Sequence, residues 1–198
     1  MTETILDCCI IGAGPAGLQA GYKMAGMGMN VRLLERGQVG QFFRQFPRHR
    51  TLISINKVHT GLTDPETKLR YDWNSLLNDD GVLFPDVSKK YFPNADVYVE
   101  YLMQFATLLG DRITEGCEVT RISKTDDLFT LECADGTAWQ ARSVIVATGV
   151  SRTWDPEIQG WDLVDKYADF DTDGAQFDDK RVLVVGKGNS AFETADAL

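Results

Sequence analysis

The pattern of apolar positions predicts a strand–helix–strand unit at the start of the chain. Residues 5–11 form an apolar run of strand length, residues 18–27 have the composition of a helix, and residues 31–35 form a second short strand. The unit is about 30 residues long, as expected for two parallel strands joined by a helix. Cys8 and Cys9 are adjacent on the first strand, so their side chains should point to opposite faces of the sheet.

The chain that follows combines an irregular segment, one clear helix and more strands. Residues 38–64 show no periodicity, and loops of this length inside a compact domain usually have a function. Residues 96–109 place apolar side chains at helical spacing. Asp135 and Gly136 predict a hairpin turn. Further strands are expected at residues 118–123, 128–133, 143–147 and 181–185.

A glycine motif lies between the first strand and the first helix. Gly12 permits a tight turn, Gly14 lets the backbone approach a pyrophosphate, and Gly17 lets the helix lie close to the sheet. The N-terminus of the helix supplies N–H groups for phosphates. Glu35 ends the next strand, where it can accept hydrogen bonds from adenosine ribose hydroxyls. Strand, helix and acid together predict a dinucleotide site.

A second motif of the same kind follows the apolar residues 181–185. Gly186, Gly188 and Ala191 occupy its three positions, and Ala is an accepted variant at the third. The residue that selects NADH or NADPH would follow Leu198, because it lies about 20 residues beyond the motif. Two such motifs predict two dinucleotides, with FAD at the first and NADPH or NADH at the second.

These patterns predict an α/β protein with two nucleotide-binding units. We assign residues 1–178 to a Rossmann-like FAD-binding domain, a parallel sheet with helices and a β-hairpin layer. We assign residues 179–198 to the truncated start of a second Rossmann-like domain, which would bind NAD(P)H.

Charge and composition narrow the class of partner. The net charge of −9 disfavours nucleic acid, because an acidic surface repels phosphate backbones. No apolar segment approaches the roughly 20 residues that span a bilayer. Residues 1–7 do not resemble a signal peptide, so we expect a cytoplasmic protein. We also expect it to act on a small-molecule substrate.

The four cysteines form no CxxC pair and are interpreted as buried apolar residues. The acidic loop at residues 169–174 is interpreted as solvated, without a metal.

The glycine motifs and the segment Ala147-Thr148-Gly149 together resemble the two-dinucleotide flavoprotein superfamily. Within it, the apolar and aromatic pattern of residues 92–106 is similar to flavin-containing monooxygenases. Residues 46–57 and 72–77 resemble a branch linked to protein degradation in the endoplasmic reticulum. The resemblance covers nearly the whole chain.

The resemblance implies roles for individual residues. Asn56 falls near the position where monooxygenases of this type place an asparagine beside the flavin ring, and it is the catalytic candidate. The implied cofactor contacts are Gly12, Gly14, Pro15, Ala16 and Gly17 for the FAD pyrophosphate, Glu35 and Arg36 for the ribose and adenine region, Val119 for the adenine through its backbone, Ala147, Thr148 and Gly149 near the FAD, and Gly186, Gly188, Asn189, Ser190 and Ala191 for the pyrophosphate of the nicotinamide nucleotide.

Two departures from the monooxygenase pattern keep other reactions open. The fingerprint FxGxxxH has no clean match at residues 158–161, and the usual Gly-Gly-x-Trp is replaced at residues 39–43. We favour an NAD(P)H-dependent FAD oxidoreductase of monooxygenase type. One alternative is a disulfide reductase, whose redox-active cysteine pair would then follow Leu198, because residues 37–60 and 151–185 contain no cysteine. Another is a flavoprotein that acts mainly through a protein partner.

A cluster of basic residues allows two interpretations. It is either an ordinary charged loop or an anion site next to the flavin. Its members are Arg44, Arg48, His49, Arg50 and Lys57.

Overall fold

A six-stranded sheet forms the centre of the protein in this computed structural model, which describes residues 5–79, 82–150 and 153–198. Residues 1–4, part of the segment assessed for a signal peptide, lie outside the described residues. The strand order is β3-β2-β1-β6-β5-β4. The strands are β1 Leu6–Ile11, β2 Val31–Leu34, β3 Ile113–Thr114, β4 Val119–Thr125, β5 Leu128–Cys133 and β6 Ala138–Val146.

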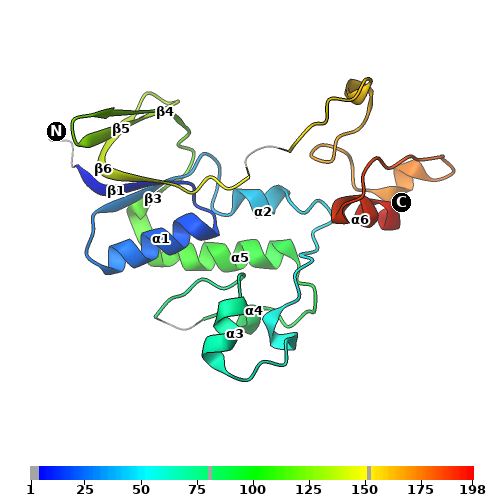
Figure 1. The fold of residues 1–198 in the computed structure, drawn as a ribbon, viewed down its shortest axis with the longest axis horizontal. Helices are drawn as coiled ribbons and strands as arrows, with labels where there is room; N and C mark the ends of the chain where they lie inside the picture. The colour runs from blue at the N-terminus through cyan, green and yellow to red at the C-terminus, as the bar shows by residue number, and fades with distance from the viewer. Residues whose placement is uncertain (1–4, 80–81, 151–152) are drawn as a thin grey trace.

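Helices and short helical turns surround this sheet (Figure 1). The predicted first helix is confirmed as α1, and the predicted helix at 96–109 as α5 and the 3-10 turn η2. The α-helices are α1 Pro15–Gly26, α2 Gln41–Gln45, α3 Pro65–Tyr71, α4 Phe84–Val87, α5 Ala95–Ala106 and α6 Asn189–Ala197. The 3-10 turns are η1 Lys57–His59, η2 Thr107–Arg112, η3 Trp161–Leu163 and η4 Gly174–Phe177.

The parallel half of the sheet contains β3, β2, β1 and β6. Strand β1 lies between β2 and β6 and is buried on both faces. Cys8 and Ile10 pack into the core under α1 and α5, whereas Cys9 packs into a second apolar cluster on the other face. The prediction that Cys8 and Cys9 point to opposite faces is therefore confirmed.

One face of the sheet is covered by α1 and α5 (Figure 1). Helix α1 can lie close to β2 because Gly21 has no side chain: an added Cβ would stand 2.7 Å from the Leu33 side chain. Helix α5 begins at Asn94, whose side chain accepts a hydrogen bond from the Asp96 N–H. Its apolar face includes Tyr98 and Leu102, neither of which is exposed to solvent. The helical periodicity thus predicted the buried face correctly.

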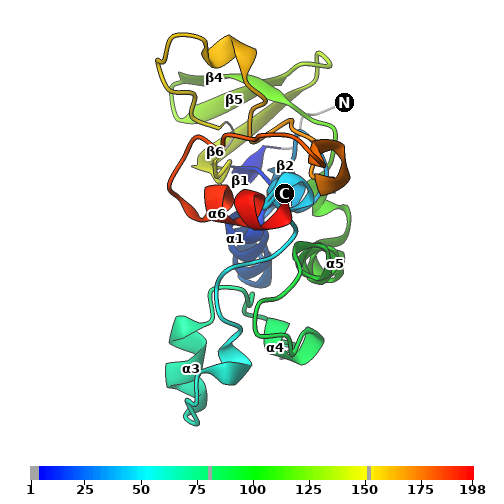
Figure 2. The same cartoon turned by 90° about the vertical axis from the view of Figure 1, so that its right-hand side faces the viewer.

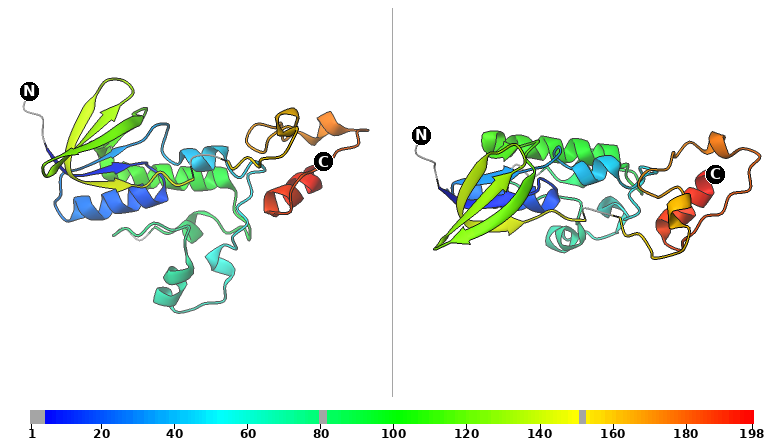
Figure 3. Two further views of the ribbon diagram at one scale, coloured as in Figure 1. Left: turned by 45° about the horizontal axis from the view of Figure 1, so that its top comes forward. Right: turned by 90° about the horizontal axis from the view of Figure 1, so that it is seen from above.

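Beyond β6 the sheet continues with the antiparallel strands β5 and β4, which curl over the face opposite α1 and α5 (Figure 3). The expected turn is present, with Gly136 at φ +86° and the Asp135 carboxylate accepting the Thr137 N–H. Strand β6 is longer than predicted, because one strand serves both the hairpin and the parallel sheet. Ala141 lies opposite Phe129 of β5 and opposite Leu6 of β1. The α/β fold with a β-hairpin layer is confirmed.

The segment between β2 and α5 forms a small lobe on the outer side of the helices (Figure 2). It contains the short elements η1, α3 and α4, whereas α2 lies nearer the sheet, against α5 (Figure 1). Gln19 of α1 holds this lobe, since its side-chain amide accepts the Leu77 N–H and donates to the Leu77 carbonyl oxygen. The Tyr22 hydroxyl donates to the Asp79 carboxylate. The irregular segment therefore folds back against α1.

The predicted strand at residues 181–185 is wrong. Among the described residues no strand is assigned there, and the six sheet strands all lie before residue 147. A strand needs a neighbour to accept its hydrogen bonds, and this segment runs toward α6 at the end of the molecule far from the sheet (Figures 1 and 3). Leu183 is accordingly 85% exposed. No helix in the described part of the chain is long and apolar enough to cross a membrane.

Candidate functional site

The first glycine turn connects β1 to α1 at the carboxyl edge of the parallel strands. Gly12 has φ +107°, which favours glycine, and its N–H donates to the Leu34 carbonyl oxygen at 2.8 Å. An added Cβ at Gly12 would stand 2.6 Å from the Ala147 carbonyl oxygen. A Cβ at Gly17 would collide with the Gly12 carbonyl oxygen. Both glycines are therefore required by close backbone packing.

Gly14 differs from these two glycines because the space around it is open. It is the N-cap of α1, and an added Cβ would meet no atom within 4 Å. Pro15 follows in the first turn, where helices leave N–H groups without intrahelical partners. A cavity of about 530 Å³ lies against this helix end. It is lined by Pro15, Ala16, Gln19, Glu66, Arg70, Asp72, Ser75, Leu76 and Leu77.

Glu35 joins the glycine turn to the end of β2. One carboxylate oxygen accepts the Ala13 N–H and the other accepts the Gly37 N–H, each at 2.8 Å. These two bonds fix the carboxylate beside the turn. A carboxylate offers about four acceptor sites, so capacity remains for ribose hydroxyls. Glu35 therefore lies next to the Gly12–Gly17 turn, as its place at the end of the second strand predicts.

The connection between β3 and β4 reaches the same corner. The Cys117 N–H donates to the Glu35 carbonyl oxygen at 2.9 Å. Arg36 and Glu118 form an ion pair at 3.8 Å between exposed side chains, and Val119 begins β4 directly afterwards. The three residues expected around the ribose and adenine, Glu35, Arg36 and Val119, therefore lie at one corner of the sheet.

Residues Ala147, Thr148 and Gly149 leave β6 at the same edge. The Ala147 N–H donates to the Ile11 carbonyl oxygen at 2.8 Å, which continues the β1–β6 pairing up to the glycine turn. Gly149 has φ +60°, so the chain turns away there. The predicted FAD contacts from three separate segments are thus brought together.

Asn56 is buried, with 1% exposure, and its amide is engaged by the backbone. Its nitrogen donates to the Ser88 carbonyl oxygen at 2.6 Å, and its oxygen accepts the Val58 N–H at 3.3 Å and so caps η1. The neighbouring Lys57 donates from Nζ to Ser54 Oγ and the Ile55 carbonyl oxygen. Burial lowers the pKa of Lys57, an effect that the Asp72 carboxylate partly opposes.

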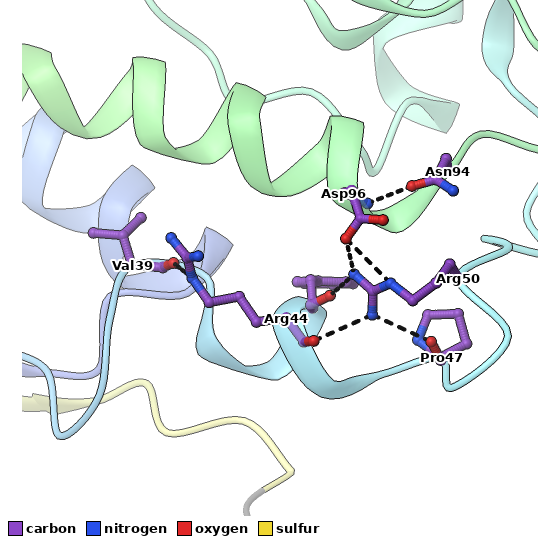
Figure 4. Close-up of polar contacts among 7 residues, drawn as sticks. Val39, Arg44, Pro47, Arg50, Asn94 and Asp96 are labelled. Carbon is purple, nitrogen blue, oxygen red and sulfur yellow. Dashed lines mark hydrogen bonds and ion pairs between the residues drawn. The ribbon is translucent and has the colours of Figure 1, made fainter. Parts of the chain in front are cut away.

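The basic cluster is engaged by contacts within the protein (Figure 4). The Arg50 guanidinium donates to Asp96 Oδ1 at 2.7 Å and to three carbonyl oxygens at the end of α2. Arg44 donates to the Val39 carbonyl oxygen, and Arg48 to that of Phe170. These contacts favour the interpretation of a structural loop over that of an anion site.

The second glycine motif has the turn but stands apart from the first. Gly188 is the N-cap of α6 with φ −90° and ψ 174°, close to the φ −80° and ψ −176° of Gly14. A Cβ at Gly188 would likewise meet no atom within 4 Å. Gly186 packs against Ala191, and Asn189 and Ser190 form the first turn of α6. A contact between His49 Nε2 and Thr194 Oγ1 at 3.0 Å links α6 to the basic loop.

The sequence did not reveal the far wall of the cavity. Arg70, Asp72 and Ser75 line it, although they are more than 50 residues from the glycine turn in the chain. The segment 72–77 resembles a flavoprotein branch in sequence, but its position in the fold depends on the contacts between Gln19 and Leu77. Such long-range pairing has no local signal in the sequence.

The chain is similar in sequence and fold to several known proteins. FAD-dependent oxidoreductase domain-containing protein 2 of Danio rerio is 43% identical over 198 residues, which cover 97% of this chain and 29% of the relative. The chain thus spans less than a third of that relative's length. Ferredoxin–NADP reductase of Streptococcus agalactiae is 26% identical, covering 100% of this chain and 52% of that protein.

A solved flavin monooxygenase from Stenotrophomonas maltophilia superposes with a TM-score of 0.76 at 25% identity, covering 96% of this chain and 53% of that one. These proteins are oxidoreductases, as the sequence predicted. Residues 9–198 match the family described as pyridine nucleotide-disulphide oxidoreductase. The chain belongs to the pyridine nucleotide-disulphide oxidoreductase family.

Proposed function

We propose that this chain forms the FAD-binding part of an oxidoreductase that takes electrons from NADPH or NADH. Residues 1–178 would be the FAD domain, and residues 179–198 would begin the domain for the nicotinamide nucleotide. The observation that carries the proposal is the open space at Gly14, at the N-terminus of α1 and beside the fixed Glu35 carboxylate. An anionic pyrophosphate is stabilised at such a helix end.

The residues around the turn suit the chemistry of FAD. Gly14, Pro15 and Ala16 present backbone to the open space, while Gly12 and Gly17 keep the turn tight. Glu35 retains acceptor sites for ribose hydroxyls, which FMN would not offer at this position because it has no adenosine. Arg36 and Val119 lie at the adenine side of Glu35, and Ala147, Thr148 and Gly149 border the turn from β6. When bound, FAD would supply the two-electron chemistry.

Gly186, Gly188, Asn189, Ser190 and Ala191 would hold the pyrophosphate of the nicotinamide nucleotide. Gly188 supports this role, because its backbone angles and open surroundings match those of Gly14. The relationship to a ferredoxin–NADP reductase supports a nicotinamide donor.

We further propose that the reaction is of flavin monooxygenase type, with a small-molecule substrate. The pattern of residues 92–106 and the Stenotrophomonas maltophilia flavin monooxygenase support this assignment. Asn56 would act as an amide donor beside the flavin. Because its side chain is 1% exposed and bonded to Ser88 and Val58, it would have to leave these contacts to reach the flavin.

Rapid mixing tests the reaction type. The full-length protein, reduced by NADPH and mixed with oxygen, should show a transient absorbance band distinct from those of oxidised and reduced flavin. Asn56→Asp should shorten that transient and release hydrogen peroxide in place of product. FAD content and melting temperature of the variant are measured in parallel, because the new carboxylate would face the Ser88 carbonyl oxygen. Wild type without a transient and without NADPH consumption above free flavin would rule out monooxygenation.

Thiol–disulfide reduction is a second candidate, and the description of the family favours it. It predicts that the full-length protein oxidises NADPH when a disulfide substrate is added. A protein that binds FAD but accelerates neither reaction would instead favour the third function, in which the flavoprotein acts through a protein partner.

A further inference from the structure

Two cysteines from different strands meet in the apolar cluster under the β4–β5 hairpin. The Cys117 and Cys133 sulfur atoms are 2.7 Å apart, with Cys117 as the S–H donor. Cys117 precedes β4 and Cys133 ends β5, where Val119 and Cys133 are paired residues. Both side chains are buried, at 3% and 6% exposure. The fold therefore places these two sulfurs together although 16 residues separate them.

We propose that Cys117 and Cys133 form an intramolecular disulfide that fastens the β4–β5 hairpin to the Glu35 corner. A disulfide such as oxidised glutathione serves as the oxidant. One cysteine thiolate attacks it and releases one glutathione; the other cysteine then attacks the mixed disulfide and releases the second. One S–S bond is formed in the protein and one is broken in the oxidant. The two protein thiols lose two protons and two electrons, which two glutathione thiols gain.

The other cysteines are placed differently. Cys8 lies on the opposite face of β1, in the core under α1. Cys9 belongs to the same apolar cluster as the pair, but among the described residues its sulfur makes no hydrogen bond to that of Cys117 or Cys133. Cys9 is therefore the one competing partner that the test must distinguish.

Burial determines when the bond can form. It raises the pKa of Cys117 to about 12, so the reactive thiolate is scarce in the folded protein. The bond would consequently form during folding or when the hairpin opens, and not while both cysteines are buried in the folded protein. Once formed, it would be sheltered from reductants by the same burial. This slow exchange distinguishes it from the exposed cysteine pair of a catalytic disulfide.

The bond would affect the corner where we place the adenine end of FAD. The Cys117 N–H donates to the Glu35 carbonyl oxygen, and the Ala134 N–H donates to the Glu118 carbonyl oxygen. Fixing Cys117 to Cys133 would hold both connections. The bond itself does not depend on FAD, whereas any effect on FAD retention rests on the proposed function.

Peptide mapping tests the bond directly. Full-length protein refolded in reduced and oxidised glutathione is denatured, alkylated and digested with trypsin. Cleavage after Arg121 and Lys124 separates the two cysteines, so a disulfide would join the peptides 113–121 and 125–142. We expect this joined pair, lighter by two hydrogen atoms than the two thiol peptides together. Alkylation of both cysteines, or a bond from either one to Cys9 or to another cysteine, would overturn the proposal.

Thermal unfolding gives a second readout, in which the main comparison is between oxidised and reduced wild type. Oxidised wild type should melt about 5 °C or more above the same protein after reduction under denaturing conditions and refolding, because the bond closes a loop of 16 residues. Cys117→Ala should remove this difference, and the matched control Cys8→Ala should keep it. An equal melting temperature of oxidised and reduced wild type would also contradict the proposal.

Discussion

The two glycine motifs of this chain have nearly the same backbone at the helix start, but only the first follows a strand of the sheet. Gly14 and Gly188 are both N-caps, with φ near −80° and −90° and with open space beside them. The strand before Gly14 lies between two parallel neighbours. The segment before Gly188 pairs with no strand among the described residues.

This difference between the two motifs separates structure that depends on neighbours in the sequence from structure that depends on distant parts of the chain. A glycine turn followed by a helix depends on residues close in sequence, so both motifs have it. A strand depends on hydrogen-bond partners from elsewhere in the fold. Residues 5–11 find partners in β2 and β6, whereas residues 181–185 find none and leave Leu183 exposed. Substitutions in the two motifs can therefore separate folding from cofactor binding.

The largest effect is expected for Gly17→Val. The new side chain would collide with the Gly12 carbonyl oxygen, so α1 must move away from β1. We expect more than about 3 kcal/mol of lost stability together with loss of bound flavin. Chemical denaturation and the flavin absorbance measure the two effects. Gly26→Val, near the other end of α1 with no atom within 4 Å, is the control and should retain flavin.

Gly14→Val should remove flavin while leaving the fold intact. Its φ of −80° suits any residue, and no protein atom lies within 4 Å of the new Cβ. The cost in stability should be about 1 kcal/mol, the difference between a good and a poor N-cap. The flavin-to-protein ratio should fall close to zero. A variant that retains stoichiometric FAD would show that the pyrophosphate does not occupy this space.

Elements fixed by nearby residues could be predicted from the sequence, whereas those that depend on distant contacts could not. Strand β1, the Gly12–Gly17 turn, α1 and Glu35 were all predicted, because an apolar run, the glycine spacing and one acid fix them locally. The lobe around Asp72 and Ser75 was not, because its position depends on contacts with α1. The pairing of Cys117 with Cys133 was also missed, since it follows from the register of β4 and β5.

Glu35→Gln should have an intermediate effect. One carboxylate oxygen would become an NH₂ group facing the N–H of Ala13 or Gly37, so one hydrogen bond to a charged acceptor is lost. We expect about 1–3 kcal/mol of lost stability and roughly tenfold weaker FAD binding. Denaturant titration and fluorescence titration of the apoprotein provide the two values. Equal FAD affinity in both proteins would mean that Glu35 serves the fold alone.

Arg36→Ala should have the smallest effect on stability. The ion pair with Glu118 spans 3.8 Å between two side chains that are more than half exposed. Such pairs contribute about 0–1 kcal/mol, which salt reduces further. The melting temperature should therefore change little, and a weaker affinity for FAD would report a contact with the cofactor. Glu118→Ala is the matched control, because it breaks the same pair but leaves Arg36 in place.

The most direct test of the account is anaerobic reduction by NADPH of full-length wild type and Gly188→Val. The central claim is that the first motif holds FAD and the second holds the nicotinamide nucleotide. Gly188 is an N-cap with open surroundings, so the valine should disturb the fold as little as Gly14→Val does. We expect Gly188→Val to retain FAD at the wild-type ratio, while NADPH reduces that FAD at least about 100-fold more slowly at the same NADPH concentration, because the pyrophosphate can no longer approach the backbone. Reduction at the wild-type rate, or loss of FAD from Gly188→Val, would contradict the claim.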